Sequence, residues 1–344
     1  MGRPESLPAS RQGGTRSSPS THEGGNEAAF ADSPVPDAVS ASPPPAGVGP
    51  ELYAWRVTLT APPRLALVHA HPDDESLCTG GTIAHYASLG VHVTVVTCTL
   101  GEEGEIIPAS LNELRAEAAD QLGGYRVGEL RSACAALRVN DHRFLGGIGR
   151  WRDSGMVGVA ANLHPRAFVA GDKAVQTEQL AEVLRQVKPQ VVVSYDSNGG
   201  YGHPDHIRAH EITMAAAAMV PEVLRVFHTV SSRDAVAAGV KKLRGVEGVP
   251  WRMPEPGELA VVDDEIITTQ VAVEDHVPAK LSALRAHATQ VGVWQNGEGA
   301  ASYALSNGIA QPVVGTEYFV LASGPAEGAE TDLFGGLNDV ERAR

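Results

Sequence analysis

Residues 64–90 read RLALVHAHPDDESLCTGGTIAHYASLG, and this stretch decides the fold. A short apolar run, 65–68, ends in a cluster of histidines and carboxylates, and a helical pattern follows from about Thr79. An apolar run bounded by turn signals is typical of a buried strand, and Pro72 interrupts that strand because it lacks a backbone donor. The stretch therefore predicts a strand, a polar loop and a helix. The loop is expected at the sheet edge where open α/β folds bind ligands.

Residues 191–206 read VVVSYDSNGGYGHPDH and repeat this arrangement far downstream. Both stretches place a His-Pro-Asp sequence after an apolar strand. Neutral imidazole and carboxylate groups form the ligand set of a catalytic zinc site, which has three protein ligands and one open position. One such loop alone is compatible with an ordinary polar surface. Two of them predict that the loops meet over one divalent metal ion.

Alternation of strands and helices extends over the rest of the chain. This pattern predicts an α/β fold with a Rossmann-like, doubly wound, mostly parallel sheet and a smaller C-terminal cap. Besides the two strands above, we expect strands at 91–98, 143–145, 223–228, 266–273 and 317–321. We expect further helices at 111–122, 127–137, 176–187, 207–219 and 278–288, and irregular segments at 157–174 and 230–260.

Composition divides the chain into four parts. Residues 1–50 are rich in Pro, Ser and Gly and are expected to be a disordered tail, because they cannot bury enough apolar surface to offset the entropy of ordering. Residues 51–260 are expected to form the catalytic core, and 261–323 a C-terminal part that completes the pocket. Residues 324–344 return to Gly, Ala and acidic residues and are expected to be a loose tail.

The global composition narrows the classes of function. The chain has 344 residues, 43% of them hydrophobic and 20% charged, which is ordinary for a globular protein. Its net charge of −14 argues against nucleic acid or an anionic membrane as a partner. The sequence contains no apolar run long enough to span a membrane and no apolar core of a signal peptide. Three widely spaced cysteines without a CxxC pair favour a reducing, cytoplasmic location.

The two histidine motifs, HAHPDDE and HPDH, resemble those of the LmbE/PIG-L-type metal-dependent deacetylases of N-acetylglucosaminyl compounds. The similarity covers about residues 64–322 and is strongest to the members that deacetylate N-acetyl-glucosaminyl-inositol in mycothiol biosynthesis. The longer motifs that carry it are TCTLGEEGE (97–105), QLGGYRVGEL (121–130), GRWRDSGM (149–156), YDSNGGYGHPDH (195–206) and LRAHATQV (284–291). The resemblance implies hydrolysis of the amide of 1-D-myo-inositol 2-acetamido-2-deoxy-alpha-D-glucopyranoside, a small sugar-inositol substrate, to acetate and a free amine.

The expected metal ligands are His71, Asp74 and His206. Asp74 follows His71 by three residues, so both can face one ion from a single turn of loop. The resemblance implies that these positions bind Zn²⁺, one ion per subunit, while Fe²⁺ also suits such ligands. The alternative for His206 is a helix cap. His210, on the same helical face, is expected to give indirect support or simple packing.

Asp73 is the expected general base, because a carboxylate beside the metal can take a proton from the attacking water. Its alternative role is to orient a metal-binding histidine. His203 and Tyr201 are suited to donate hydrogen bonds to the developing oxyanion. Asp205 is expected to hold His203 in its charged form.

Arg126 and Asp153 are the candidates for binding sugar or inositol hydroxyls, because arginine offers a planar fork of donors and a carboxylate accepts from two hydroxyls. A surface salt bridge is the alternative for both. The acidic loop at 102–105 is expected to be solvated, and the cysteines to be structural.

Two rival functions within the same family remain open from the sequence: an amidase of mycothiol S-conjugates and another N-acetylglucosaminyl deacetylase. An amidase of mycothiol S-conjugates would share the metal loops but bind a larger acyl group. A non-catalytic, sugar-binding Rossmann protein is disfavoured, because no GxGxxG follows the first strand, and a serine hydrolase because no GxSxG is present. The sequence leaves open whether the chain forms a homo-oligomer.

Overall fold

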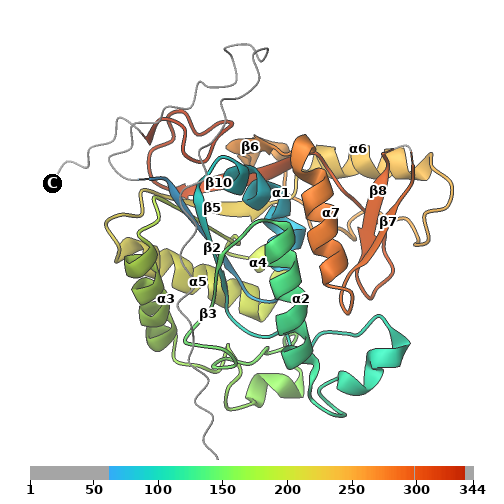
Figure 1. Ribbon diagram of the computed structural model, residues 1–344, viewed down its shortest axis with the longest axis horizontal. Coiled ribbons are helices and arrows are strands. Elements are labelled where there is room, and N and C mark those ends of the chain that lie inside the picture. Colours follow the sequence, from blue (N-terminus) through green and yellow to red (C-terminus); the bar gives the residue numbers. More distant parts are fainter. Residues whose placement is uncertain (1–61, 298, 338–344) are drawn as a thin grey trace, which may run out of the picture. The chain divides into compact units, whose positions relative to one another are not determined.

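The structure, a computed structural model, describes residues 62–297 and 299–337 (Figure 1). The tail expected at 1–50 lies outside the described residues. Within them, a seven-stranded sheet has the order β3-β2-β1-β4-β5-β10-β6. Its strands are β1 (Arg64–His69), β2 (His92–Thr97), β3 (Asp141–Phe144), β4 (Val191–Ser194), β5 (Arg225–Val230), β6 (Thr269–Ala272) and β10 (Thr316–Ser323).

The five strands from β3 to β5 run parallel, and β10 is antiparallel to them. Strand β6 pairs antiparallel with β10 at the edge of the sheet, so it runs in the direction of the five. The order 3-2-1-4-5 is that of a doubly wound fold, so the predicted fold class is confirmed. The order reverses between β1 and β4, which pair in register from Leu65↔Val191 to Leu67↔Val193. The loops after these two strands are the two histidine stretches, and the topology therefore brings them together.

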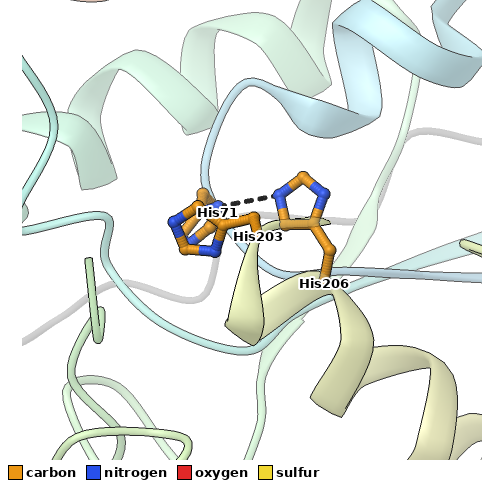
Figure 2. A group of neighbouring side chains, drawn as sticks. All are labelled: His71, His203 and His206. Carbon is orange, nitrogen blue, oxygen red and sulfur yellow. Dashed lines mark hydrogen bonds between the residues drawn. The ribbon is translucent and has the colours of Figure 1, made fainter. Parts of the chain in front are cut away.

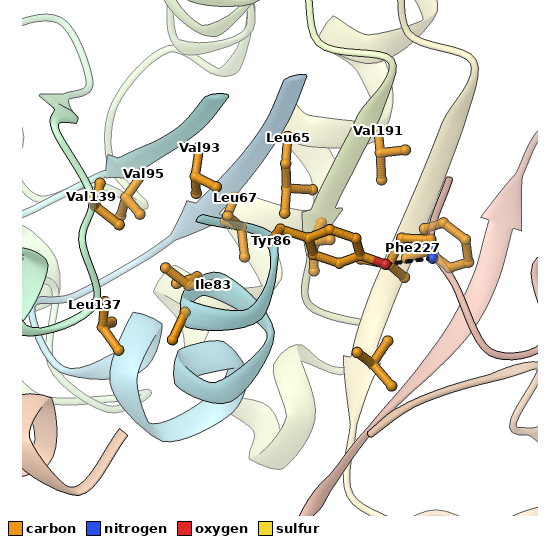
Figure 3. Packing of buried hydrophobic residues seen from close by; sticks show 14 of the residues in the cluster. Leu65, Leu67, Ile83, Tyr86, Val93, Val95, Leu137, Val139, Val191 and Phe227 are labelled. Atoms are coloured by element: carbon orange, nitrogen blue, oxygen red, sulfur yellow. Dashed lines mark hydrogen bonds between the residues drawn. The ribbon is translucent and has the colours of Figure 1, made fainter. Parts of the chain in front are cut away.

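Helices cover both faces of the sheet (Figure 1). Leu65 and Leu67 of β1 belong to one core cluster, and the intervening Ala66 and Val68 belong to the other. This alternation follows from the two-residue period of a strand. The first cluster, drawn in Figure 3, includes side chains of α1 (Asp74–Ser88), α2 (Leu122–Ala136) and α7 (Val277–Ala286). The second includes side chains of α3 (Lys173–Val187) and α5 (Pro204–Ala218).

Several expected helices differ from the observed ones. Helix α1 begins at Asp74 instead of near Thr79, so Asp74 is a helical residue and Asp73 precedes the helix. The helix expected at 111–122 is wrong: the segment holds a short 3₁₀ helix, η2 (Ala109–Leu114), with no buried residue. Without an apolar face to bury, a short helix has little to stabilise it.

Two elements were not expected. Helix α6 (Arg233–Arg244) lies in the segment predicted to be irregular, and it has a strongly apolar side despite its charged residues. A small antiparallel sheet follows α7 and consists of β7 (Gly292–Gln295), β8 (Ala301–Ala304) and β9 (Gln311–Pro312). The remaining short elements are α4 (Gly199–Gly202), η3 (Ala160–Leu163), η4 (Asp264–Ile266) and η5 (Glu274–His276).

The loose tail expected from residue 324 is wrong over the described residues 324–337. Leu333 and Phe334 are buried in the first core cluster. Arg225 is fully buried at the start of β5, and its guanidinium donates to the carbonyls of Pro325, Glu327 and Leu333. A domain boundary at 260 stays a prediction. Among the described residues, no helix has the length and apolarity needed to cross a membrane.

Candidate metal centre

The three expected ligands lie together at the point where the strand order reverses. His71 lies in the loop after β1, Asp74 is the first residue of α1, and His206 lies in the first turn of α5. Helix α5 begins at Pro204, and its N-cap is His203, whose Nδ1 accepts a hydrogen bond from the backbone of Asp205. The helix start therefore fixes the direction in which the second histidine motif projects.

The ligand atoms of these residues form a nearly equilateral triangle. The Nδ1 atom of His71 lies 3.2 Å from Nε2 of His206 and 3.4 Å from Oδ2 of Asp74. The distance between Nε2 of His206 and Oδ2 of Asp74 is 3.5 Å. Tetrahedral zinc with bonds of about 2.0–2.1 Å separates neighbouring ligand atoms by roughly 3.3 Å. These donors therefore fit a single ion of that kind.

The imidazole of His206 is oriented for ligation. Its Nδ1 lies 3.2 Å from the carbonyl oxygen of Gly199, to which it donates, so the lone pair of Nε2 faces the centre of the triangle. Gly199 adopts φ +62°, and a Cβ atom there would lie 2.6 Å from Cβ of His206, so only glycine fits. The Tyr195 ring stacks on the imidazole, 4.1 Å between centroids. Burial lowers the pKa of His206 to about 4, so the ring is neutral.

The opposite nitrogen of His71 faces carboxylates. Its Nε2 lies 3.4 Å from Oδ1 of Asp153 and 3.4 Å from Oδ2 of Asp205. Burial favours the neutral ring, but Asp153, Asp205 and Asp74 outweigh it and raise the pKa of His71 well above its ordinary value. A carboxylate behind a ligating histidine fixes its tautomer and increases its basicity. Burial opposes ionisation of Asp74, yet His206 and His71 hold its pKa well below the usual range.

Figure 2 shows how the rings of His71, His203 and His206 converge from the two loops. Ligand-type atoms of these three residues lie within 4.8 Å of one another, as do those of His71, Asp153 and Asp205. The described residues thus contain a buried group of histidines and carboxylates that could hold a metal ion.

The expected pairing of Asp205 with His203 differs from the observed contacts. The Asp205 carboxylate accepts from the backbone of Ser154 and faces His71, and its Oδ1 has no partner among the described residues. His203 accepts at Nδ1, which leaves its proton on Nε2. Burial, together with His71 and His206, lowers the pKa of His203 to about 4. The ring is therefore a neutral donor and not the imidazolium that the sequence suggested.

Asp73 lies beside the ligands in a strained conformation, with φ +123° and ψ −31°. Such a conformation in a residue other than glycine costs on the order of 1–3 kcal/mol. The Arg126 guanidinium donates to Oδ2 of Asp73 at 3.0 Å and to the carbonyls of Pro72 and Gly101. Burial raises the pKa of Asp73 to about 7 against the opposing charge of Arg126.

A cavity of about 1230 Å³ opens above these groups. It is lined by every expected site residue except Asp205, which is fully buried beneath His71. Tyr201 is 57% exposed and lies at the mouth, with its ring 5.0 Å from that of His206. Asp153 reaches the cavity wall and also accepts from the backbone of Gly155. His210 bonds to the carbonyl of Tyr195 and lies outside the ligand group, as expected.

Three further residues of the site were missed. Glu75 accepts from the backbone of Asp73, and His287 donates to Glu75. Glu102, expected to be solvated, is buried and accepts from the backbone of Asp153. The available signal was their position inside the HPDDE, LGEEGE and LRAHATQV motifs.

Residues 66–217 match the sequence profile of the GlcNAc-PI de-N-acetylase (PIG-L) family. The 1D-myo-inositol 2-acetamido-2-deoxy-alpha-D-glucopyranoside deacetylase of Actinosynnema mirum is 71% identical over 281 residues, which are 82% of this chain and 99% of the relative. The chain belongs to the PIG-L family. The predictions of this family and of a deacetylase are thus confirmed.

A second relative matches the same share of this chain. The 1D-myo-inositol 2-acetamido-2-deoxy-alpha-D-glucopyranoside deacetylase 1 of Saccharopolyspora erythraea is 66% identical over 292 residues, covering 82% of this chain and 96% of the relative. Among solved structures, the N,N'-diacetylchitobiose deacetylase from Pyrococcus horikoshii is 18% identical, covers 70% of this chain and 75% of that chain, and gives a TM-score of 0.45.

Proposed function

We propose that this PIG-L deacetylase hydrolyses the acetamide of 1D-myo-inositol 2-acetamido-2-deoxy-alpha-D-glucopyranoside to acetate and a free amine. The observation that carries the proposal is the triangle of His71, Asp74 and His206 with the Asp73 carboxylate beside it. The names of the A. mirum and S. erythraea relatives support this substrate. The pathway would be mycothiol biosynthesis, in keeping with the motifs.

The proposed metal is zinc, held by His71, Asp74 and His206, with iron as the alternative. When bound, such an ion supplies a Lewis acid and lowers the pKa of a water ligand toward neutrality. The donor set favours this class of metal, because two imidazoles, which bind a metal in their neutral form, and one ionised carboxylate leave an open coordination position.

Asp73 is the proposed base. Its carboxylate accepts the proton of the attacking water while the water oxygen bonds to the acetyl carbon. It returns that proton to the sugar nitrogen when the C–N bond breaks, so a neutral amine and acetic acid leave. The acid then releases its remaining proton to solvent and becomes acetate. The raised pKa of Asp73 suits both steps, because a carboxyl group with a pKa of about 7 can hold the proton between them.

His203 and Tyr201 are the proposed donors to the tetrahedral oxyanion. The Nε2 proton of His203 is available, since its Nδ1 is occupied by the backbone of Asp205. Tyr201 is exposed at the mouth and lies in α4, between Gly200 and Gly202, both of which have positive φ. The backbone around this ring is therefore adaptable. Asp205 acts on His71 in this account, and through its peptide on His203.

Arg126 and Asp153 are the proposed contacts to the sugar hydroxyls. Both line the cavity, and Nε of Arg126 is a buried donor with no partner among the described residues. Asp153 is held as a carboxylate by His71, and so can accept from a hydroxyl. The cavity is large for a small-molecule site, and its volume is ample for a sugar and an inositol ring.

The test is an assay of acetate release from this substrate with wild-type protein before and after removal of metal by a chelator, and after addition of zinc. We expect activity that is lost on chelation and restored by zinc. A mycothiol S-conjugate of bimane is assayed in parallel. A metal-loaded protein that cleaves only the conjugate would replace the proposed substrate with a larger amide.

A further inference from the structure

The backbone of Asp73 is bound by the side chain of Glu75, which has no role in the proposed mechanism. The Asp73 peptide N–H donates to Oε2 of Glu75 at 3.0 Å. The carbonyl of Asp73 accepts from the peptides of Ser76 and Leu77 in the first turn of helix α1. Both polar groups of this residue are therefore fixed, and its φ of +123° is kept by those contacts. Strained residues persist only when their surroundings over-determine them.

Glu75 is in turn held by a residue 212 positions away. Its Oε1 accepts from Nε2 of His287 at 2.7 Å and from the Ser76 hydroxyl at 2.5 Å. Glu75 and His287 are both completely buried. His287 directly follows α7, so the C-terminal part of the chain reaches under the loop that carries the base.

This pair makes no contact with the ligand triangle among the hydrogen bonds of the described residues. Its link to the site is the Asp73 peptide, whose orientation sets the direction of the Asp73 carboxylate. The Arg126 guanidinium donates a hydrogen bond to the same carboxylate. A buried charged pair is weak evidence for stability, because apolar residues of similar shape often replace it without loss. What the pair contributes here is the carboxylate oxygen of Glu75, which accepts a hydrogen bond from the strained Asp73 peptide.

We propose that Glu75 and His287 are positioning residues that hold the strained Asp73 peptide and thereby aim its carboxylate at the attacking water. This inference rests on the proposed role of Asp73 as the base. Glu75 supplies the acceptor, and His287 fixes the rotamer and charge of Glu75. Neither residue touches substrate.

The principal variant replaces the pair by apolar residues of similar size, Glu75→Met with His287→Leu, which keeps the packing but removes the acceptor. We expect kcat to fall about 10- to 100-fold, as is typical when a supporting partner is removed. KM and the bound zinc per chain should stay within about twofold, since the substrate contacts and ligands are untouched. Glu75→Gln retains an oxygen that can accept from the Asp73 peptide and should recover most of kcat.

A double-mutant cycle with Asp73→Ala tests the route of the effect. In that background, adding Glu75→Met with His287→Leu should leave kcat unchanged, because the base that the pair positions is gone. If the pair still lowers kcat by its full factor there, or if it leaves kcat of the wild-type background unchanged, the proposal is wrong.

The matched control is Glu129→Met. Glu129 is also buried and accepts from the peptide and hydroxyl of Thr289, two residues after His287, and among the described residues no hydrogen bond joins it to Glu75 or Asp73. The Glu129→Met variant loosens the same segment, so we expect a lower unfolding temperature and a kcat near that of the wild type. An equal loss of kcat in Glu129→Met would assign the effect to the segment as a whole and overturn the proposal.

A readout without turnover separates this inference from the proposed substrate. Crystal structures of the wild type and of Glu75→Met with His287→Leu should show positive φ at Asp73 in the first and a relaxed backbone in the second. If the wild type releases no acetate, the proposed function fails while this comparison still decides the positioning. An unchanged Asp73 backbone in the variant would refute it.

Discussion

The Nε2 atom of His206 lies 3.2 Å from the Nδ1 atom of His71, although the two residues are 135 positions apart. Each ring is held from its far side: His206 donates from Nδ1 to Gly199, and the Nε2 atom of His71 faces two carboxylates. The two facing nitrogens are thus the ones left to act as acceptors. A cation between them, shared with Asp74, accounts for this arrangement.

His206→Ala should lose the metal. One vertex of the ligand triangle disappears, and His210, one turn further along α5, is bonded to the Tyr195 carbonyl. We expect zinc per chain, measured by elemental analysis after dialysis, to fall from about one to a small fraction. His210→Gln is the control and should keep the metal. Full occupancy in His206→Ala would show that the ion binds elsewhere.

Tyr201→Phe should lower kcat with little change in KM. The variant removes only the hydroxyl, and an oxyanion donor contributes chiefly in the transition state. Loss of one such donor typically costs about 10²-fold or more. Steady-state kinetics of acetate release check this. A variant with raised KM and normal kcat would place the hydroxyl on bound substrate instead.

The buried pair of Lys280 and Glu317 should contribute to stability through its mutual satisfaction. Lys280 Nζ lies 2.6 Å from Oε1 of Glu317, which also accepts from the peptides of Gly81 and Thr82 in α1. Lys280→Met leaves a buried, uncompensated carboxylate and should lower the free energy of unfolding by about 3–5 kcal/mol. Adding Glu317→Gln should return part of the loss. Denaturant titration of both variants gives the comparison, and additive losses would speak against the pairing.

The charged pair of Glu75 and His287 is expected to stabilise the fold within a limited range of pH. Burial opposes the charge on Glu75, but His287 outweighs it and lowers the pKa to about 2. Burial likewise opposes the charge on His287, and Glu75 raises its pKa above 6.5. The stabilisation from Glu75 is complete above its unfolded value of 4.5 and is lost as pH falls toward 2. That from His287 is complete below 6.5 and is lost as pH rises through its folded pKa.

The wild type is therefore expected to exceed the double variant Glu75→Met with His287→Leu in free energy of unfolding. This excess should be largest between pH 4.5 and 6.5. Denaturant titrations of the metal-free proteins across the pH range measure it. A difference that is independent of pH would mean that one of the two groups is uncharged in the folded chain.

Much of the fold follows from local pattern. The apolar runs at β1, β2 and β4 are continuous because both faces of a parallel sheet are covered, and their polar ends identify the binding edge. The helix expected at 111–122 failed because its pattern has no buried partner in the fold. Helix α6 and the small sheet of β7, β8 and β9 were missed because short or charged elements depend on tertiary packing that no local pattern displays.

The proximity of His71, Asp74 and His206 could be predicted, since two similar motifs at adjacent strand ends must meet. The hydrogen bonds that link the side chains around the site could not be predicted. Asp205 was assigned to His203 because they are two residues apart, but the turn into α5 directs its carboxylate to His71. The link from Glu75 to His287 spans 212 residues and appears only when α7 packs beside α1.

We propose that Asp73 carries the proton in a metal-dependent deacetylation. The most direct measurement is acetate release by zinc-loaded Asp73→Ala compared with zinc-loaded wild type, with metal content determined on the same samples. We expect an unchanged zinc content and a kcat lower by roughly 10²–10⁴-fold. Full turnover by Asp73→Ala with its zinc in place would contradict it.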